Sequence, residues 1–238
     1  MKKIISVLAI VFVIFSFSSC RKVNGEGPLQ TEDRSISNFS GLSTSISGKI
    51  YFTEGAVYQV QLIAQRNILD VIETYKTGSK LIIKFRNNVS VKNHSDITVN
   101  ITAPSLDDLQ LSGAANVNVL GNFNAANFDA AVSGSGNLSI DNLQVTNTLN
   151  ASVSGSGSIK LLAGQANEAK AHVSGSGTVD MAVVQTNRAV ATISGSGSAK
   201  LNVVQTLNAS ISGSGNVYYW GNPSVSTHIS GSGKVIKM

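Results

Sequence analysis

The tetrapeptide Ser133-Gly134-Ser135-Gly136 is the strongest indication of the fold, because the same sequence recurs along the rest of the chain. Further copies begin at Ser154, Ser174, Ser194, Ser212 and Ser230, and a degenerate copy, Ser-Gly-Ala-Ala, begins at Ser112. The successive intervals are 21, 21, 20, 20, 18 and 18 residues. A nearly constant period of this size is typical of stacked repeats, in which each unit buries its apolar face only against its neighbours.

Apolar residues flank the phrase at fixed offsets. Two residues before the first glycine stand Val132, Val153, Val173, Ile193, Ile211 and Ile229. Two residues after the second glycine stand Leu138, Ile159, Val179, Ala199, Val217 and Val235. These positions share one parity and the residues between them are polar, an alternation that predicts strands with one buried face. An all-β solenoid therefore follows from the pattern.

The glycines of the phrase fall on the inward parity, where either a positive φ or a close approach of the backbone would require them. Ala115 replaces the second glycine in the first copy. Because alanine is small but disfavours positive φ, crowding explains the second glycine better, and a flattened corner stays open for the first. Two further patterns predict stacking in register. They are an outward column (Ser139, Lys160, Asp180, Lys200, Tyr218) and recurrent Gln/Asn corners (144–147, 165–167, 185–187, 205–208), at which amide ladders can form.

The composition fits one elongated domain, with 42% hydrophobic and 13% charged residues among 238. The formal net charge is +5, to which Lys2 and Lys3 contribute. So mild a charge, without a recognition helix or zinc spacing, gives no reason to expect a nucleic-acid partner.

The first twenty residues have the form of an export signal. Lys2 and Lys3 precede an apolar run over 4–17, which Ser18, Ser19 and Cys20 follow. A basic start, a short apolar stretch and small residues before the cleavage site are typical of a secretory signal. Cys20, the only cysteine, resembles the lipidated cysteine of a bacterial lipobox. We therefore expect a lipoprotein signal peptide over 1–19 and attachment to the outer membrane through lipid on Cys20.

The remaining chain divides into three segments by composition. Residues 20–33 are polar and contain Gly25, Gly27 and Pro28, which predicts a flexible tether. Residues 34–110 form a β region, which we expect either to add larger turns to the stack or to cap its end. Residues 111–238 form the repeat solenoid, and 34–238 is expected to be one continuous domain.

Several short motifs in their order resemble one known family. They are Phe39-Ser40-Gly41-Leu42, Tyr51-Phe52-Thr53-Glu54-Gly55, Leu81-Ile82-Ile83, Ala103-Pro104-Ser105-Leu106 and the Ser-Gly-Ser-Gly series. Together with the leader they resemble the DUF2807 family, labelled auto-transporter adhesins or head GIN domain proteins and common in Bacteroidetes. The resemblance covers roughly residues 34–235. It implies a right-handed parallel β-helix in the cell envelope, and no catalytic residue comes with it.

The residues themselves give little support to catalysis, a cofactor or a metal site. His172 and His228 share a column with two turns between them, a separation of about 14 Å that is too long for one zinc ion, and His94 lies elsewhere. The repeated serines have no histidine or acid repeating beside them, as a nucleophile would need. The aspartates fall in unlike columns, apart from the neighbours Asp107 and Asp108. No carboxylate follows the glycines, as calcium-binding repeats require.

Two surface features are candidates for ligand contact. Lys80, Lys84 and Arg86 share one parity of a strand, and they either meet acidic glycans or headgroups or form a solvated, edge-protecting face. Tyr218 and Trp220 share the outward parity near the C-terminal end, where they either contact a ligand or pack as an end cap. We expect a non-catalytic surface that binds a polysaccharide or an envelope protein. The alternatives are a structural component without a ligand and a polysaccharide-acting enzyme.

Overall fold

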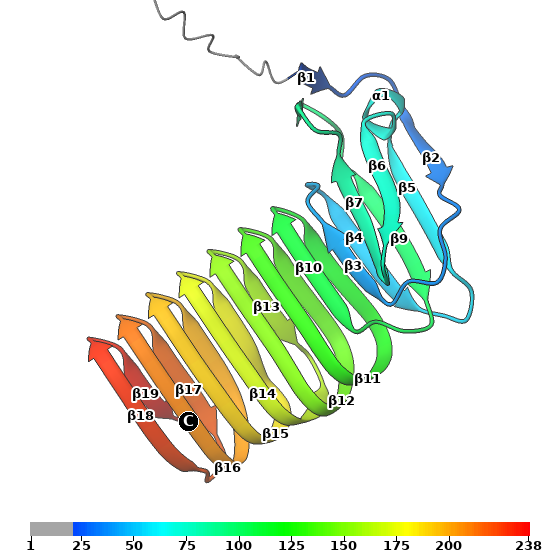
Figure 1. Ribbon diagram of the computed structural model, residues 1–238. Helices are drawn as coiled ribbons and strands as arrows, with labels where there is room; N and C mark the ends of the chain where they lie inside the picture. Colours follow the sequence, from blue (N-terminus) through cyan, green and yellow to red (C-terminus); the bar gives the residue numbers. More distant parts are fainter. Residues whose placement is uncertain (1–20) are drawn as a thin grey trace, which may run out of the picture.

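A computed structural model describes residues 21–238, most of which lie in strands. From residue 108 onward the chain winds into a stack of turns, which Figure 1 shows running from green to red. The strands of this stack are β10 (Asp108–Gly113), β11 (Asn116–Gly134), β12 (Asn137–Gly155), β13 (Ser158–Leu161), β14 (Gly164–Gly175), β15 (Thr178–Gly195), β16 (Ser198–Gly213), β17 (Asn216–Trp220), β18 (Ser224–Gly231) and β19 (Lys234–Lys237).

Every pairing within this stack is parallel, which confirms the predicted parallel β-helix. Val132 pairs with Val153, and Val153 with Val173, so the apolar columns of the sequence are columns of the fold. The outward column that begins at Ser139 is also in register from turn to turn. Within it Asp180 forms an ion pair with Lys200 at 3.1 Å.

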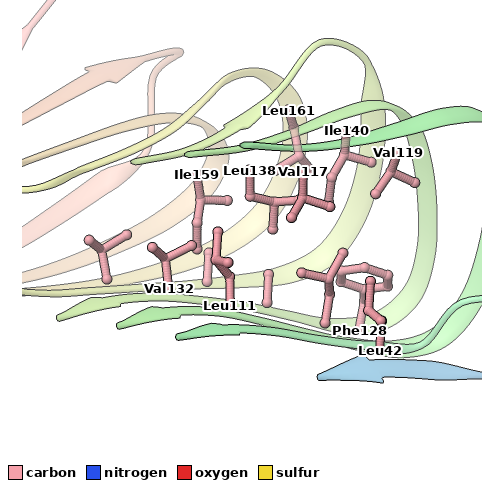
Figure 2. Close-up of a cluster of buried hydrophobic side chains, with 14 of the residues drawn as sticks. Leu42, Leu111, Val117, Val119, Phe128, Val132, Leu138, Ile140, Ile159 and Leu161 are labelled. Carbon is pink, nitrogen blue, oxygen red and sulfur yellow. The ribbon is translucent and has the colours of Figure 1, made fainter. Parts of the chain in front are cut away.

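The core lies between two walls of strand. Figure 2 shows Val117, Leu138 and Ile159 on one wall, facing Leu111 and Val132 on the other. These five side chains are at most 1% exposed. Because a long strand such as β11 passes along both walls, a single turn supplies residues to both sides of the core.

Each glycine of the repeated phrase has its own structural reason. The first glycine adopts a positive φ in every copy, as in Gly134 (φ 125°) and Gly155 (φ 118°). The second glycine has no positive φ, but a Cβ on Gly136 would lie 2.6 Å from the carbonyl oxygen of Ala115 in the previous turn. Crowding at the second glycine is therefore confirmed, and the first glycine makes the corner.

The N-terminal half both continues the stack and caps it. Two strands extend each wall in parallel: β3 (Gly41–Thr44) and β7 (Lys80–Phe85) follow β10, and β4 (Lys49–Glu54) and β9 (Thr98–Ala103) follow β11. Antiparallel strands then close the end, as Figure 1 shows; they are β2 (Leu29–Asp33), β5 (Gln59–Gln65) and β6 (Ile72–Thr77). The short helix α1 (Arg66–Leu69) follows β5. Some strands of this region thus add turns to the stack and others cap its end, so each of the two expected alternatives describes part of it.

The segment expected to be a tether is structured instead. β1 (Arg21–Asn24) pairs in parallel with β8 (Val89–Lys92), and β2 pairs with β5. The polar composition of 21–33 gave no sign of these strands, because a strand at a sheet edge needs few apolar side chains. Residues 21–33 therefore belong to the folded domain, which was expected to span only 34–238.

The opposite end of the stack has no cap among the described residues. Val225 and Ile229 of β18 stand in inward columns, yet they are 38% and 41% exposed. Within residues 21–238, no helix is long or apolar enough to cross a membrane.

Candidate binding sites

A groove of about 680 Å³ opens at the corner opposite the glycines. The walls come from four successive turns of the stack, contributed by β11, β12, β14 and β15. Its lining residues are Asn124, Ala125, Ala126, Gln144, Val145, Thr146, Gln165, Ala166, Asn167 and Asn187. None of them carries a charge, and five carry a side-chain amide. We call this hollow the amide groove.

A change in corner length accompanies the amide groove. Two residues, Thr146 and Asn147, lie between the paired positions Val145 and Thr148, whereas only Asn167 lies between their partners Ala166 and Glu168. The pairing register shifts at this point. On the other side of β12, only Ala126 of β11 lies between Ala125 and Asn127, the partners of Val145 and Thr148. The longer corner of β12 therefore lies in the groove between the shorter corners of β11 and β14, and the repeat period falls from 21 to 20 residues in the turn that follows β12.

The amides of the groove are aligned by the strand register. Asn124 pairs with Gln144, and Gln144 with Gln165, on successive strands. The Nδ2 of Asn187 donates to Oδ1 of Asn167 at 3.0 Å, as the predicted ladder requires. Gln144 instead donates to Asn142 of its own turn at 3.0 Å. The sequence repeat indicated the ladder but not the hollow beside it.

Tyr218 and Trp220 lie on β17 with partly exposed side chains. Tyr218 stands between Lys200 and Ile236 in the register, and Trp220 pairs with Asn202. Both aromatic residues keep the outward parity of the strand, next to the last turn. Their position leaves aromatic surface on the outside of the stack.

Lys80 and Lys84 of β7, and Arg86 directly after this strand, are engaged in ion pairs. Lys80 Nζ lies 3.0 Å from Asp108 Oδ2, and Lys84 Nζ lies 3.5 Å from Glu73 Oε2. Arg86 Nε lies 3.8 Å from Oε1 of Glu73. Because an acidic partner accompanies each cation, this strand presents a mixed surface rather than a positive patch.

The aspartates are better aligned than the sequence analysis expected. Asp108 of β10 is in register with Asp129 of β11, so these two carboxylates do share a column. Each is held by a neighbour: Lys80 pairs with Asp108, and Nδ2 of Asn150 donates to Asp129 Oδ1 at 2.6 Å. Both aspartates stand four residues before the first serine of their repeat copy, which was the missed signal.

The histidines are arranged as the repeat predicts. His172 and His228 share a column, with Thr192 and Ser210 in the turns between them. His94 lies apart from them, with its Nδ1 2.7 Å from the carbonyl oxygen of Ser95. No group of three or more His, Cys, Asp or Glu within the described range could hold a metal ion. Cys20, the predicted lipidation site, lies outside the described residues.

Fold and surface together define a parallel β-solenoid that offers a neutral corner groove and an aromatic pair on its outer wall. The chain belongs to the DUF2807 family, described as "Putative auto-transporter adhesin, head GIN domain", whose model matches residues 38–223. This confirms the family resemblance of the sequence motifs. No match was found among curated proteins.

Solved structures show the same fold. A "putative adhesin" from Bacteroides fragilis is similar with a TM-score of 0.83 and 24% identity, over 91% of this chain and 100% of the other. A "putative adhesin" from Parabacteroides merdae has a TM-score of 0.73 and 23% identity, over 92% and 99% of the two chains. A "Putative lipid binding protein" from Parabacteroides distasonis has a TM-score of 0.73 and 22% identity, over 92% and 100%.

Proposed function

We propose that this protein is a non-catalytic binding surface of the bacterial cell envelope, which holds a polysaccharide or an envelope protein by non-covalent contacts. The family description is that of an adhesin, and one similar structure carries the name of a lipid-binding protein. Both descriptions name binding rather than turnover. The proposal also includes export by the signal at 1–19 and anchoring of the chain to the outer membrane through lipid on Cys20.

The observation that carries the proposal is the aromatic pair on the outer wall. Tyr218 and Trp220 are partly exposed on a strand that is hydrogen-bonded on both sides, to β16 and β19. A rigid strand fixes aromatic side chains at little entropic cost, and such side chains stack on sugars or anchor protein interfaces. We therefore assign the first ligand contact to Tyr218 and Trp220.

The support for ligand binding by Lys80, Lys84 and Arg86 is weaker. The ion pairs of Lys80, Lys84 and Arg86 would have to be exchanged for contacts with a partner. An exposed ion pair is worth only about 0–1 kcal/mol, so an acidic polymer remains a testable second ligand for this strand. A solvated face explains the same residues without a ligand, whereas edge protection does not, because β7 is paired with β3 on one side and with β6 on the other.

The enzyme alternative has one specific observation in its favour, the aligned carboxylates of Asp108 and Asp129. Paired carboxylates are the usual catalytic groups of glycoside hydrolysis. Here Lys80 and Asn150 engage them, which supports a structural role for the pair. A purely structural envelope component, without any ligand, is the other alternative.

The test is a binding array of envelope polymers and glycans, probed with residues 21–238, the part that contains every described strand. A matched Tyr218→Ala/Trp220→Ala variant is probed beside it. We expect selective binding by the native sequence and its loss in the variant. Binding to nothing on the array or in an envelope extract, by protein with an intact melting transition, would contradict the proposal and favour the structural role.

A further inference from the structure

We infer that the amide groove is a second binding site, which takes an uncharged polysaccharide laid along the solenoid axis. This inference rests on the proposed binding function and deepens it, because it names a ligand class and a site apart from Tyr218 and Trp220. No sequence motif predicts the groove, which coincides with the change in corner length between β12 and β14.

The first argument is the chemistry of the lining. All ten lining residues are uncharged, and they include amides, a hydroxyl and small apolar side chains. A side-chain amide both donates and accepts hydrogen bonds, as a sugar hydroxyl does. An anionic polymer would find no cation among these residues. The lining therefore matches a neutral, hydroxyl-rich ligand.

The second argument is the availability of the amides. The side chains of Asn124 and Gln165 form no hydrogen bond to another side chain within the described fold, and both are exposed. Asn167 uses its oxygen to accept from Asn187, which leaves the Asn167 NH2 group and the Asn187 oxygen free to bind a ligand. The groove thus offers donors and acceptors that are already oriented by the strands.

The third argument is the spacing. Parallel strands place equivalent side chains about 4.8 Å apart, and Asn124, Gln144 and Gln165 occupy three successive strands in register. The rise of one sugar in an extended β-linked glycan is close to this spacing. Successive sugars of such a chain would therefore meet successive amides, which gives a repeating ligand an advantage over a single sugar.

The same strands disfavour a peptide. β12 is paired with β11 on one side and with β13 and β14 on the other, and β14 is paired with β12 and β15. A peptide recognised by strand addition needs an unpaired sheet edge, and the groove has none. A glycan needs no edge, because it binds side chains rather than the backbone ladder.

The experiment is affinity electrophoresis of residues 21–238 in gels that contain hydroxyethyl cellulose, xylan or galactomannan, with polygalacturonate as the anionic comparison. A Gln144→Ala/Gln165→Ala variant removes two amides from the groove, and Thr146→Arg blocks it with a bulky cation. Gln205→Ala is the matched control, because Gln205 is an exposed glutamine of the same repeat outside the groove. Equal melting temperatures establish that the variants are folded.

We expect at least one neutral polysaccharide to retard the native protein and the Gln205 variant, with binding about tenfold weaker in both groove variants. If retardation is lost only in Tyr218→Ala/Trp220→Ala, the inference that the amide groove binds a polysaccharide is wrong, but the proposed function still holds. Retardation by polygalacturonate alone, or capture of a protein partner with no neutral polysaccharide retained, would also overturn it. If nothing binds at either site, the groove and the proposed function fail together.

Discussion

The carbonyl oxygen of Gly134 lies where a side chain on Gly155 would have to stand, because a Cβ built there would be only 2.5 Å from it. The same relationship links Gly175 to Gly155 and Gly195 to Gly175, at 2.6 Å in each case. The corner therefore depends on glycine twice: for its positive φ and for the closeness of the preceding turn. A solenoid of this form transmits the requirement from turn to turn, which is why the phrase repeats.

Replacing Gly155 by alanine is expected to lower the free energy of unfolding by about 1–3 kcal/mol, from backbone strain and from the clash with Gly134. Ser156→Ala, one residue further along and exposed, is the matched control and should stay within about 0.5 kcal/mol of the native protein. Urea unfolding followed by circular dichroism measures both. Equal stability of the two variants would contradict the steric account of the corner.

Lys80→Ala tests the structural interpretation of the basic strand. Gly41 separates β7 from β10 in this column, and its missing side chain leaves room for Lys80 to reach Asp108 across it. Because both partners are about one-quarter exposed, we expect a loss of about 1 kcal/mol in the free energy of unfolding. Lys92→Ala, an exposed lysine on β8, is the control.

Polymer retention should be unchanged in the Lys80 variant. Thermal unfolding and affinity electrophoresis of the same preparation distinguish a structural role of Lys80 from a role in ligand binding. Full stability combined with lost binding to an anionic polymer would instead make this strand a ligand contact.

The Lys49–Asp96 pair predicts a small loss of stability in acid. Lys49 Nζ lies 2.9 Å from Asp96 Oδ2, and this hydrogen bond and the charge of Lys49 lower the pKa of Asp96 from its ordinary 3.8. A lowered pKa stabilises the fold above pH 3.8, and the contribution disappears as the pH falls through the lowered value. Asp96→Asn should therefore reduce the difference in unfolding midpoint between pH 6 and pH 2. An unchanged difference would mean that the pair does not persist in solution.

The sequence predicted the repeat solenoid well because its signals are local and recur. Val132 and Leu138 keep the same offsets from the glycines in copy after copy, so their columns could be aligned without a structure. The role of Gly136 could be inferred for a similar reason, since Ala115 replaces it in one copy. Asp108 and Asp129 could have been aligned in the same way, at four residues before each first serine.

The strands within residues 21–33 and the amide groove could not be predicted from local patterns. β1 pairs with β8, far along the chain, and the polar residues of this strand resemble a linker when they are considered alone. The groove accompanies a shift in pairing register, and its effect on Thr146 and Asn167 depends on how two corners pack. The fall in repeat length from 21 to 20 residues indicates where the corner length changes, but it does not predict a groove there.

Non-catalytic binding requires that the protein bind a polymer and leave the polymer unchanged. Residues 21–238 are titrated against a polysaccharide that the array identifies, and the chain length of that polymer is then measured by size-exclusion chromatography. We predict saturable, reversible binding and an unaltered polymer, with the same result for an Asp108→Asn/Asp129→Asn variant. Shortening of the polymer by the native protein, absent in that variant, would contradict the claim and establish an enzyme.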